Sequence, residues 1–308
     1  MYLKSRNHTA AHIEIWYLDD QTFSNPHMEQ RVIGIDLGGT NVRAAIVAGD
    51  RIESMQVARI PASGSYDDVL QTLFTITDAV MQGPVAAIGI GVPSVVDLET
   101  GIVYDVQNIP AWTEVPLKAL LEARYKIPVF VNNDANCFAL GEFYFGQGQG
   151  SHSMIGLTIG TGLGAGIIIN KKLYAGPNCG AGEFGMVAYL DKFYEWYASG
   201  QFFKNVYGVN GEEVFQQAKR GEARAVEMYH EFGTHFGNAM KMILYTYDPS
   251  LIVLGGSVRH AYELFQKPMW KQLESFVFPR SVQRLQIKIS SLQNSGLLGA
   301  AALYFDAL

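Results

Sequence analysis

The chain has 308 residues, of which 48% are hydrophobic and 17% charged. This is enough apolar material for a complete core, it excludes an intrinsically disordered chain, and the length favours two lobes or domains. A formal net charge of −6 leaves no basic surplus to neutralise a phosphate backbone, so a nucleic-acid partner is not expected. Two cysteines, Cys137 and Cys179, form neither a disulfide framework nor a four-ligand zinc site by themselves, which is typical of a cytoplasmic protein.

The first thirty residues show no structural pattern. They carry Asp19, Asp20 and scattered histidines, and they lack the apolar stretch of a signal peptide. No apolar run reaches the length of about 18 residues that a membrane span needs, so no membrane partner is expected. We expect residues 1–30 to be a loosely ordered N-terminal extension, unless translation begins at Met28, just before the first strong pattern.

From residue 31 onwards, short apolar strands alternate with helical patterns. In chain order the sequence predicts strands over 32–35 and 42–47, a helix over 66–82, a strand over 85–92, a helix over 116–125, a strand over 129–131, a helix over 135–144, strands over 154–159 and 163–169, two helices within 212–246 that break near Gly221, a strand over 251–254, a helix over 260–275, a strand over 285–289 and a helix over 297–305. This alternation is typical of an α/β protein.

Two segments resemble each other without gaps: VIGIDLGGTNVRAAIV (32–47) and MIGLTIGTGLGAGIII (154–169). Each reads as a strand, a glycine turn and a second apolar strand. The similarity predicts two lobes of related design, each with a glycine hairpin, although two unrelated hairpins of short apolar strands would also look alike.

The glycine turns are suited to phosphate binding, because several backbone N–H groups can converge where no Cβ obstructs them. Asp36, at the end of the first strand, is placed to hold a hydrated Mg²⁺ beside the phosphates. The alternative is a pair of ordinary hairpins. A Walker GxxxxGK[ST] pattern is absent, and the turns join two strands instead of opening a helix, which excludes P-loop and Rossmann sites. The predicted ATP- and Mg²⁺-binding residues of the two turns are Asp36, Gly38, Gly39, Thr40, Asn41, Arg43, Thr161, Gly162 and Gly164.

Asp134 lies in the segment Asn132-Asn-Asp-Ala-Asn136, between a predicted strand and a predicted helix. A kinase that acts on an alcohol needs a carboxylate beside the attacking hydroxyl, to accept its proton. An aspartate in front of a helix is also a common N-cap. The residues alone leave both interpretations open.

Four motifs together resemble the ROK sugar kinases (repressor, open reading frame, kinase), over about residues 31–305. The first is Asp36-Leu-Gly-Gly-Thr-Asn-Val-Arg43 and the second is Thr158-Ile-Gly-Thr-Gly-Leu-Gly-Ala-Gly166. The others are the adenosine-binding turn Leu254-Gly-Gly-Ser257 and the C-terminal helix Gly296-Leu-Leu-Gly-Ala-Ala-Ala302. The resemblance implies an α/β, two-lobe, actin-like ATPase fold (ribonuclease H-like), with the active site in the inter-lobe cleft. The lobes would comprise residues 31–131 plus 294–308, and residues 132–293.

The resemblance also implies ATP-dependent phosphorylation of a hexose, with glucose favoured and O6 as the acceptor, in a homodimer. It assigns Asp134 as the general base and Gly255 and Gly256 to adenosine. The sugar ligands that it implies are Asn108, Asn133, Asp134, Glu183 and Glu195. A sugar-binding protein without catalysis, or a repressor-type regulator, is the alternative within the same family.

The chain departs from the family pattern at Met186, where the family usually has a histidine that ligates a structural zinc. Eight residues separate Met186 from Glu195, and none of them is Cys or His. We therefore expect no structural zinc site. A thioether in place of this histidine also leaves the identity of the sugar open.

Overall fold

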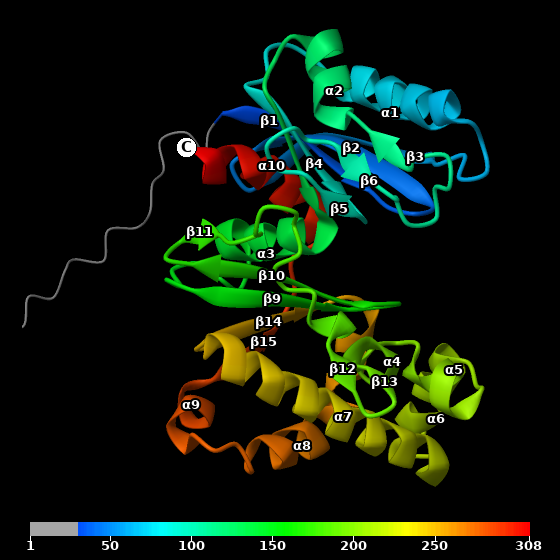
Figure 1. The fold of residues 1–308 in the computed structure, drawn as a ribbon, viewed down its shortest axis with the longest axis vertical. Coiled ribbons are helices and arrows are strands. Elements are labelled where there is room, and N and C mark those ends of the chain that lie inside the picture. Colours follow the sequence, from blue (N-terminus) through cyan, green and yellow to red (C-terminus); the bar gives the residue numbers. More distant parts are fainter. Residues whose placement is uncertain (1–29) are drawn as a thin grey trace, which may run out of the picture.

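The computed structural model describes residues 30–308 (Figure 1). The predicted extension over residues 1–30, apart from Gln30, and the alternative start at Met28 lie outside the described residues. Two five-stranded sheets form the centre of the described chain. The first sheet has the order β3 (Arg51–Arg59), β2 (Asn41–Ala48), β1 (Arg31–Leu37), β4 (Ala87–Val92), β8 (Val129–Asn133). The second has the order β11 (Lys172–Leu173), β10 (Leu163–Ile169), β9 (Met154–Ile159), β14 (Leu251–Gly255), β15 (Gln286–Ile289).

The two sheets share one topology. In the first, β1 is antiparallel to β2 and parallel to β4, and β4 is parallel to β8. In the second, β9 is antiparallel to β10 and parallel to β14, and β14 is parallel to β15. The internal similarity between residues 32–47 and 154–169 is thereby confirmed as two equivalent hairpins, β1–β2 and β9–β10.

Helices cover both faces of the sheets. They are α1 (Tyr66–Val80), α2 (Leu117–Tyr125), α3 (Asp134–Phe145), α4 (Tyr194–Ala198), α5 (Phe202–Tyr207), α6 (Gly211–Lys219), α7 (Ala223–Tyr247), α8 (Tyr262–Leu273), α9 (Pro279–Arg284) and α10 (Ser295–Ala307). Figure 1 shows α1 and α2 beyond the first sheet and α7 and α8 beyond the second, with α3 and α10 between the sheets. Short pieces complete the chain: β5 (Val95–Val96), β6 (Val103–Tyr104), β7 (Glu114–Val115), β12 (Ala188–Tyr189), β13 (Lys192–Phe193) and the 3₁₀ turns η1 (Phe184–Met186) and η2 (Ser257–Ala261).

Helices α3 and α10 join the two halves at very close range. A Cβ on Gly299 of α10 would overlap the carbonyl oxygen of Cys137 in α3, and a Cβ on Gly89 of β4 would overlap that of Ala300. Only glycine permits these approaches, so α10 seats on the first sheet and on α3 at once. Buried side chains of α3, α10 and the facing strands form a core of their own there, between the separate cores of the two sheets.

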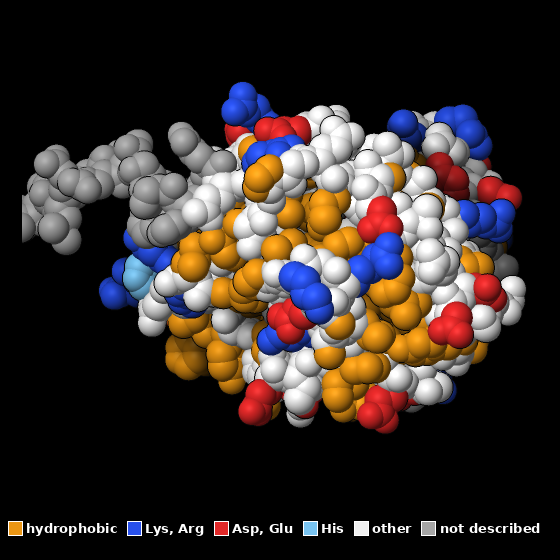
Figure 2. Space-filling view, turned by 90° about the horizontal axis from the view of Figure 1, so that it is seen from above, with side chains coloured by type: hydrophobic (Ala, Val, Ile, Leu, Met, Phe, Trp, Pro, Cys, Tyr) orange, Lys and Arg blue, Asp and Glu red, His pale blue; other side chains and the backbone are white. Residues whose placement is uncertain are grey.

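The face of the first sheet's helices carries charges of both signs. Figure 2 shows Lys and Arg side chains interspersed with Asp and Glu side chains among hydrophobic and neutral ones. No single sign of charge dominates this face. Among residues 30–308, no helix is both long and apolar enough to cross a membrane.

Candidate active site

Asp134 is the first residue of α3, at the point where β8 ends. The helix is capped by its neighbour Asn133, whose Oδ1 accepts a hydrogen bond of 2.8 Å from Ala135 N. Asp134 Oδ1 also accepts from Ala135 N at 2.8 Å. The N-cap position that was the alternative for Asp134 thus belongs to Asn133, and the Asp134 carboxyl accepts from backbone N–H groups at the same corner.

Two other carboxyl groups act on Asp134. Burial, followed by the like charge of Asp36 and then that of Glu183, raises the pKa of Asp134 to about 6. Asp36 is in β1 of the first sheet and Glu183 lies in the loop between β11 of the second sheet and η1, so both halves of the chain contribute to the same site. The second hairpin also reaches this point, because a Cβ on Gly164 would lie 3.1 Å from the Cβ of Ala135.

The first glycine turn follows Asp36. Arg43 Nη1 of the paired strand lies 3.9 Å from Asp36 Oδ2, and burial raises the pKa of Asp36 although Arg43 opposes the shift. Gly38 N donates to the carbonyl of Asn41 at 2.9 Å, which closes the turn. A Cβ on Gly39 would lie 2.7 Å from Asn108 Nδ2, so the predicted sugar ligand Asn108 lies directly against this turn.

The second glycine turn is linked to the predicted sugar ligands. Glu195 Oε2, from α4, accepts a hydrogen bond of 2.9 Å from Leu163 N, at the exit of the turn. A Cβ on Gly162 would lie 2.7 Å from the same oxygen. Burial, and then the like charge of Glu195, raises the pKa of Glu183. Asp36, Asp134, Glu183 and Glu195 therefore form a chain of neighbouring acids that runs from one glycine turn to the other.

Asn133 is more heavily engaged than the sequence indicates. Besides the cap, its Nδ2 donates to the carbonyl of Ser94 at 3.2 Å. Behind it, Asn132 Oδ1 accepts from the backbone N of Asn133, from Asn136 Nδ2 and from the thiol of Cys179. This network fixes the strand-to-helix corner that carries Asp134.

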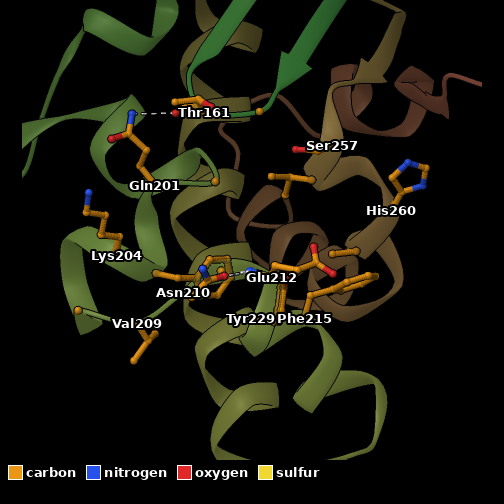
Figure 3. A pocket seen from close by; sticks show the side chains of 17 residues that line it. Thr161, Gln201, Lys204, Val209, Asn210, Glu212, Phe215, Tyr229, Ser257 and His260 are labelled. Atoms are coloured by element: carbon orange, nitrogen blue, oxygen red, sulfur yellow. Dashed lines mark hydrogen bonds between the residues drawn. The ribbon is translucent and has the colours of Figure 1, made fainter. Parts of the chain in front are cut away.

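A cavity of about 900 Å³ lies at the second glycine turn, on the side away from the acids, and Gly160 and Thr161 of the turn line it. Figure 3 shows Thr161 and Gln201 at one end of it, Ser257 and His260 along a side, and Phe215 and Tyr229 at the opposite end. Gln201 Nε2 donates to the carbonyl of Thr161 at 2.9 Å. The lining also includes Gly160, Gly200, Phe203, Lys204, Gly208, Val209, Asn210, Gly211, Glu212, Val258 and Ala261.

The glycines predicted to contact adenosine lie behind this cavity. Gly255 and Gly256 do not line it, whereas the residues that follow them, Ser257 and Val258, do. Gly256 has a φ of 75°, and a Cβ there would overlap the carbonyl oxygen of Ile159. It therefore supports the wall through its backbone conformation.

The sequence did not identify the α5–α6 side of the cavity. Asn210 is the N-cap of α6, Phe215 and Tyr229 belong to amphipathic helices, and Glu212 is in the first turn of α6. Each of these residues fits an ordinary helical pattern. The sequence therefore does not distinguish it from a residue with a purely structural role. Among residues 30–308, no three His, Cys, Asp or Glu side chains are arranged to hold a metal ion.

Comparison with known proteins assigns the family. The sequence profile of the ROK family matches residues 32–307. The chain is 29% identical to a glucokinase of Halalkalibacterium halodurans, over 88% of this chain and 94% of the relative. It is 30% identical to an N-acetyl-D-glucosamine kinase of Vibrio parahaemolyticus, over 88% and 98% of the two chains.

A solved structure gives the same result. The ROK family glucokinase of Streptomyces griseus, in complex with glucose and AMPPNP, superposes with a TM-score of 0.74 at 30% identity, over 89% of this chain and 98% of the other. The predicted α/β, two-lobe, actin-like ATPase fold is thereby confirmed.

Proposed function

The chain belongs to the ROK family and is a sugar kinase, and from this premise we propose that it transfers the γ-phosphoryl group of ATP to O6 of a hexose, with glucose as the favoured acceptor and Asp134 as the general base. The observation that carries the proposal is the solvent-accessible carboxyl of Asp134 at the start of α3, with a pKa raised to about 6, in a chain of acids between two glycine turns. Glucose is favoured because the relatives include glucokinases and because the solved glucokinase binds glucose.

Asp134 supplies the proton acceptor. At neutral pH a carboxyl with a pKa of about 6 is mostly ionised and is more basic than an ordinary aspartate. As the C6 hydroxyl oxygen forms its bond to the γ-phosphorus, its proton passes to the Asp134 carboxylate, and the bond from the γ-phosphorus to the β,γ-bridging oxygen breaks. ADP leaves with the bridging oxygen, and Asp134 returns the proton to solvent.

The sugar would bind beside Asp134, with its other hydroxyls against Glu183 and Glu195. A carboxylate accepts hydrogen bonds from two adjacent hydroxyls at once, and the charge of Glu195 is near enough to raise the pKa of Glu183. Leu163 N–H fixes the orientation of the Glu195 carboxylate. Asn108, which lies against the first turn, and Asn133, which caps α3, would add amide contacts.

ATP is the substrate that the second turn and its cavity suit. The cavity is large enough for a nucleoside, and the aromatic rings of Phe215 and Tyr229 lie at its end. The phosphates would then cross the turn around Thr161 and Gly162 and reach Thr40, Asn41 and Arg43 of the first turn. The adenosine end and the acids would thus lie on opposite sides of the second turn.

Mg²⁺ fits the residues of the first turn. It is usually held by one or two carboxylates together with substrate phosphates and water, and Asp36 is a half-buried carboxylate in that place. When bound, the ion would neutralise charge that develops on the transferring phosphoryl group. The role of Asp36 is to hold it beside the phosphates.

The test uses glucose and 6-deoxyglucose with ATP. Phosphorus NMR of the products should show phosphate on O6 of glucose, and 6-deoxyglucose should inhibit competitively without being phosphorylated. Phosphate on another oxygen would refute the assignment of O6. Binding of glucose without any phosphorylated product would instead support the alternative, a sugar-binding family member without catalysis.

A further inference from the structure

A short hairpin, β12–β13, lies between the two predicted sugar carboxylates in the chain. Glu183 precedes it by one turn of 3₁₀ helix, and Glu195 follows it in α4. Ala188 pairs with Phe193, and Tyr194 N donates to the carbonyl of Val187 at 3.0 Å. Leu190 at its tip is 68% exposed, so the hairpin buries little surface of its own and needs an anchor elsewhere.

The anchor is on α7. Asn238 Nδ2 donates to the hydroxyl oxygen of Tyr189 at 3.0 Å, and the same hydroxyl lies 3.0 Å from His235 Nδ1. Because Asn238 donates to the oxygen, the hydroxyl proton is available to His235 Nδ1, and we assign Nδ1 as the unprotonated nitrogen. In this tautomer the proton is on His235 Nε2, which lies 3.6 Å from Glu231 Oε1.

Stacked rings extend the anchor into α4. Tyr189 stacks on Tyr194 with a centroid distance of 4.3 Å and an interplanar angle of 13°. Tyr197 lies edge-on to Tyr189 at 5.7 Å and tilted against His235 at 5.0 Å. Tyr194 and Tyr197 flank Glu195 in the same short helix, so the ring cluster fixes the element that bears this carboxylate.

We propose that His235 and Tyr189 are positioning residues for the sugar site, because they fasten the hairpin and thereby set the places of Glu183 and Glu195. The proposal rests on the proposed function, since it takes these two carboxylates as the sugar ligands. The hairpin is held against α7 by hydrogen bonds and aromatic rings of the chain itself. It lies in the segment between Met186 and Glu195, which contains no Cys or His.

The fastening depends on a neutral His235. A proton on Nδ1 would remove the acceptor of the Tyr189 hydroxyl proton at this position. Burial lowers the pKa of His235, although Glu231 opposes the shift, so the neutral form is favoured and the anchor weakens as the pH falls. The polar and titratable groups around His235 are Glu231 and Asn238 on α7, Tyr189 on β12, Tyr197 on α4 with Asp191 bonded to its hydroxyl, and Tyr207 on α5 bonded to Glu231.

The first test is Tyr189→Phe, which keeps the ring stack and removes the hydroxyl. The matched control is Tyr125→Phe on α2, which also loses a bonded hydroxyl, the one that reaches Asp78 Oδ1 at 2.8 Å. Loss of one hydrogen bond changes affinity by about three- to tenfold. Tyr189→Phe should raise the KM for the hexose by that factor and leave kcat and the KM for ATP within about twofold, and the control should change none of them.

Hydrogen exchange separates the proposal from the function on which it rests. Amides of residues 183–198 should exchange faster in Tyr189→Phe than in the wild type, without any ligand, and not in Tyr125→Phe. If these amides exchange at the same rate in Tyr189→Phe as in the wild type, Tyr189 does not hold the hairpin in place. If they exchange faster but the hexose KM is unchanged, His235 and Tyr189 are not positioning residues for the sugar site. If the wild type phosphorylates no hexose, the proposed function and the positioning role fall together, while exchange still decides the fastening.

The second test compares His235→Gln with His235→Leu. The Gln amide oxygen can accept from Tyr189, whereas Leu cannot, so Gln should restore most of the hexose affinity that Leu loses. Asp134 and Glu183 also titrate in the site, so the pH effect is read as a difference. As the pH falls below the ordinary range of a histidine, the hexose KM of the wild type should rise more steeply than that of His235→Gln. Equal pH profiles, or equal losses in Gln and Leu, would contradict the proposal.

Discussion

Asp134→Asn is the most informative single substitution. The Asn side chain has almost the same shape, and its Oδ1 can still accept the hydrogen bond of 2.8 Å from Ala135 N. The helix keeps its cap, because Asn133 Oδ1 also accepts from Ala135 N. The substitution therefore removes the charge and the basicity of the group and little else.

Asp134→Asn should have two effects, a loss of activity and a gain in stability. General-base catalysis contributes about 10²- to 10⁴-fold, so kcat should fall by that factor while the affinity for glucose changes little. The folded-state pKa of about 6 lies above the ordinary value of an aspartate. The folded protein thus binds this proton more tightly than the unfolded chain does, so the ionised group destabilises the folded state above pH 6. This effect is absent below the ordinary aspartate pKa. Because Asp134 is exposed, solvent screens the charge, and Asp134→Asn should raise the stability only slightly at neutral pH.

The assay combines steady-state kinetics with unfolding in urea at pH 7.5. Asp306→Asn is the matched control, because Asp306 also has a pKa raised by burial and accepts from a backbone N–H, that of Leu173, away from the turns. The control should lose a buried charge without loss of turnover. In the wild type, kcat should fall about tenfold per unit below pH 6 as Asp134 becomes protonated. An Asp134→Asn enzyme with near-normal turnover would refute the reasoning.

Three further substitutions test the two turns. Gly162→Ala places a Cβ 2.7 Å from Glu195 Oε2, so the carboxylate must move from Leu163 N and the KM for glucose should rise with little change in the KM for ATP; an unchanged glucose KM would contradict the role of Glu195. Gly256→Ala forces an L-residue to a φ of 75° against the Ile159 carbonyl, and urea unfolding should show a loss of about 1–3 kcal/mol, whereas wild-type stability would count against the strain argument. Asp36→Asn removes a charged ligand, so a titration of Mg²⁺ should show the apparent KM for MgATP raised about tenfold or more; equal values for the two proteins would exclude Asp36 as the Mg²⁺ ligand.

Much of the fold follows from the sequence, because its central elements have strong apolar patterns. Strands β1, β4, β9 and β14 are almost fully buried and appear as continuous apolar runs. The break near Gly221 is confirmed between α6 and α7. Strand β3 was not predicted, because it is an edge strand whose side chains are mostly exposed or half-buried and whose composition is mixed.

The site was predicted unevenly. The glycine turns and the corner at Asp134 are local in the chain, so short motifs identify them. The wall formed by Asn210, Phe215 and Tyr229 comes together only when α6 and α7 pack beside the second turn, and each of these residues has an ordinary helical role as well. Likewise the anchor of the β12–β13 hairpin joins Tyr189 to His235, 46 residues away, and no local pattern marks such a pair.

One site is proposed to combine two ATP-binding glycine turns with an acid that deprotonates a sugar hydroxyl. The most direct test is to measure ADP release by the purified wild type, with each of a panel of hexoses and amino sugars and with no sugar at all. The account predicts slow release without sugar and a large stimulation by at least one hexose, with glucose first. Release of ADP at the same rate whether or not any sugar is present would contradict it.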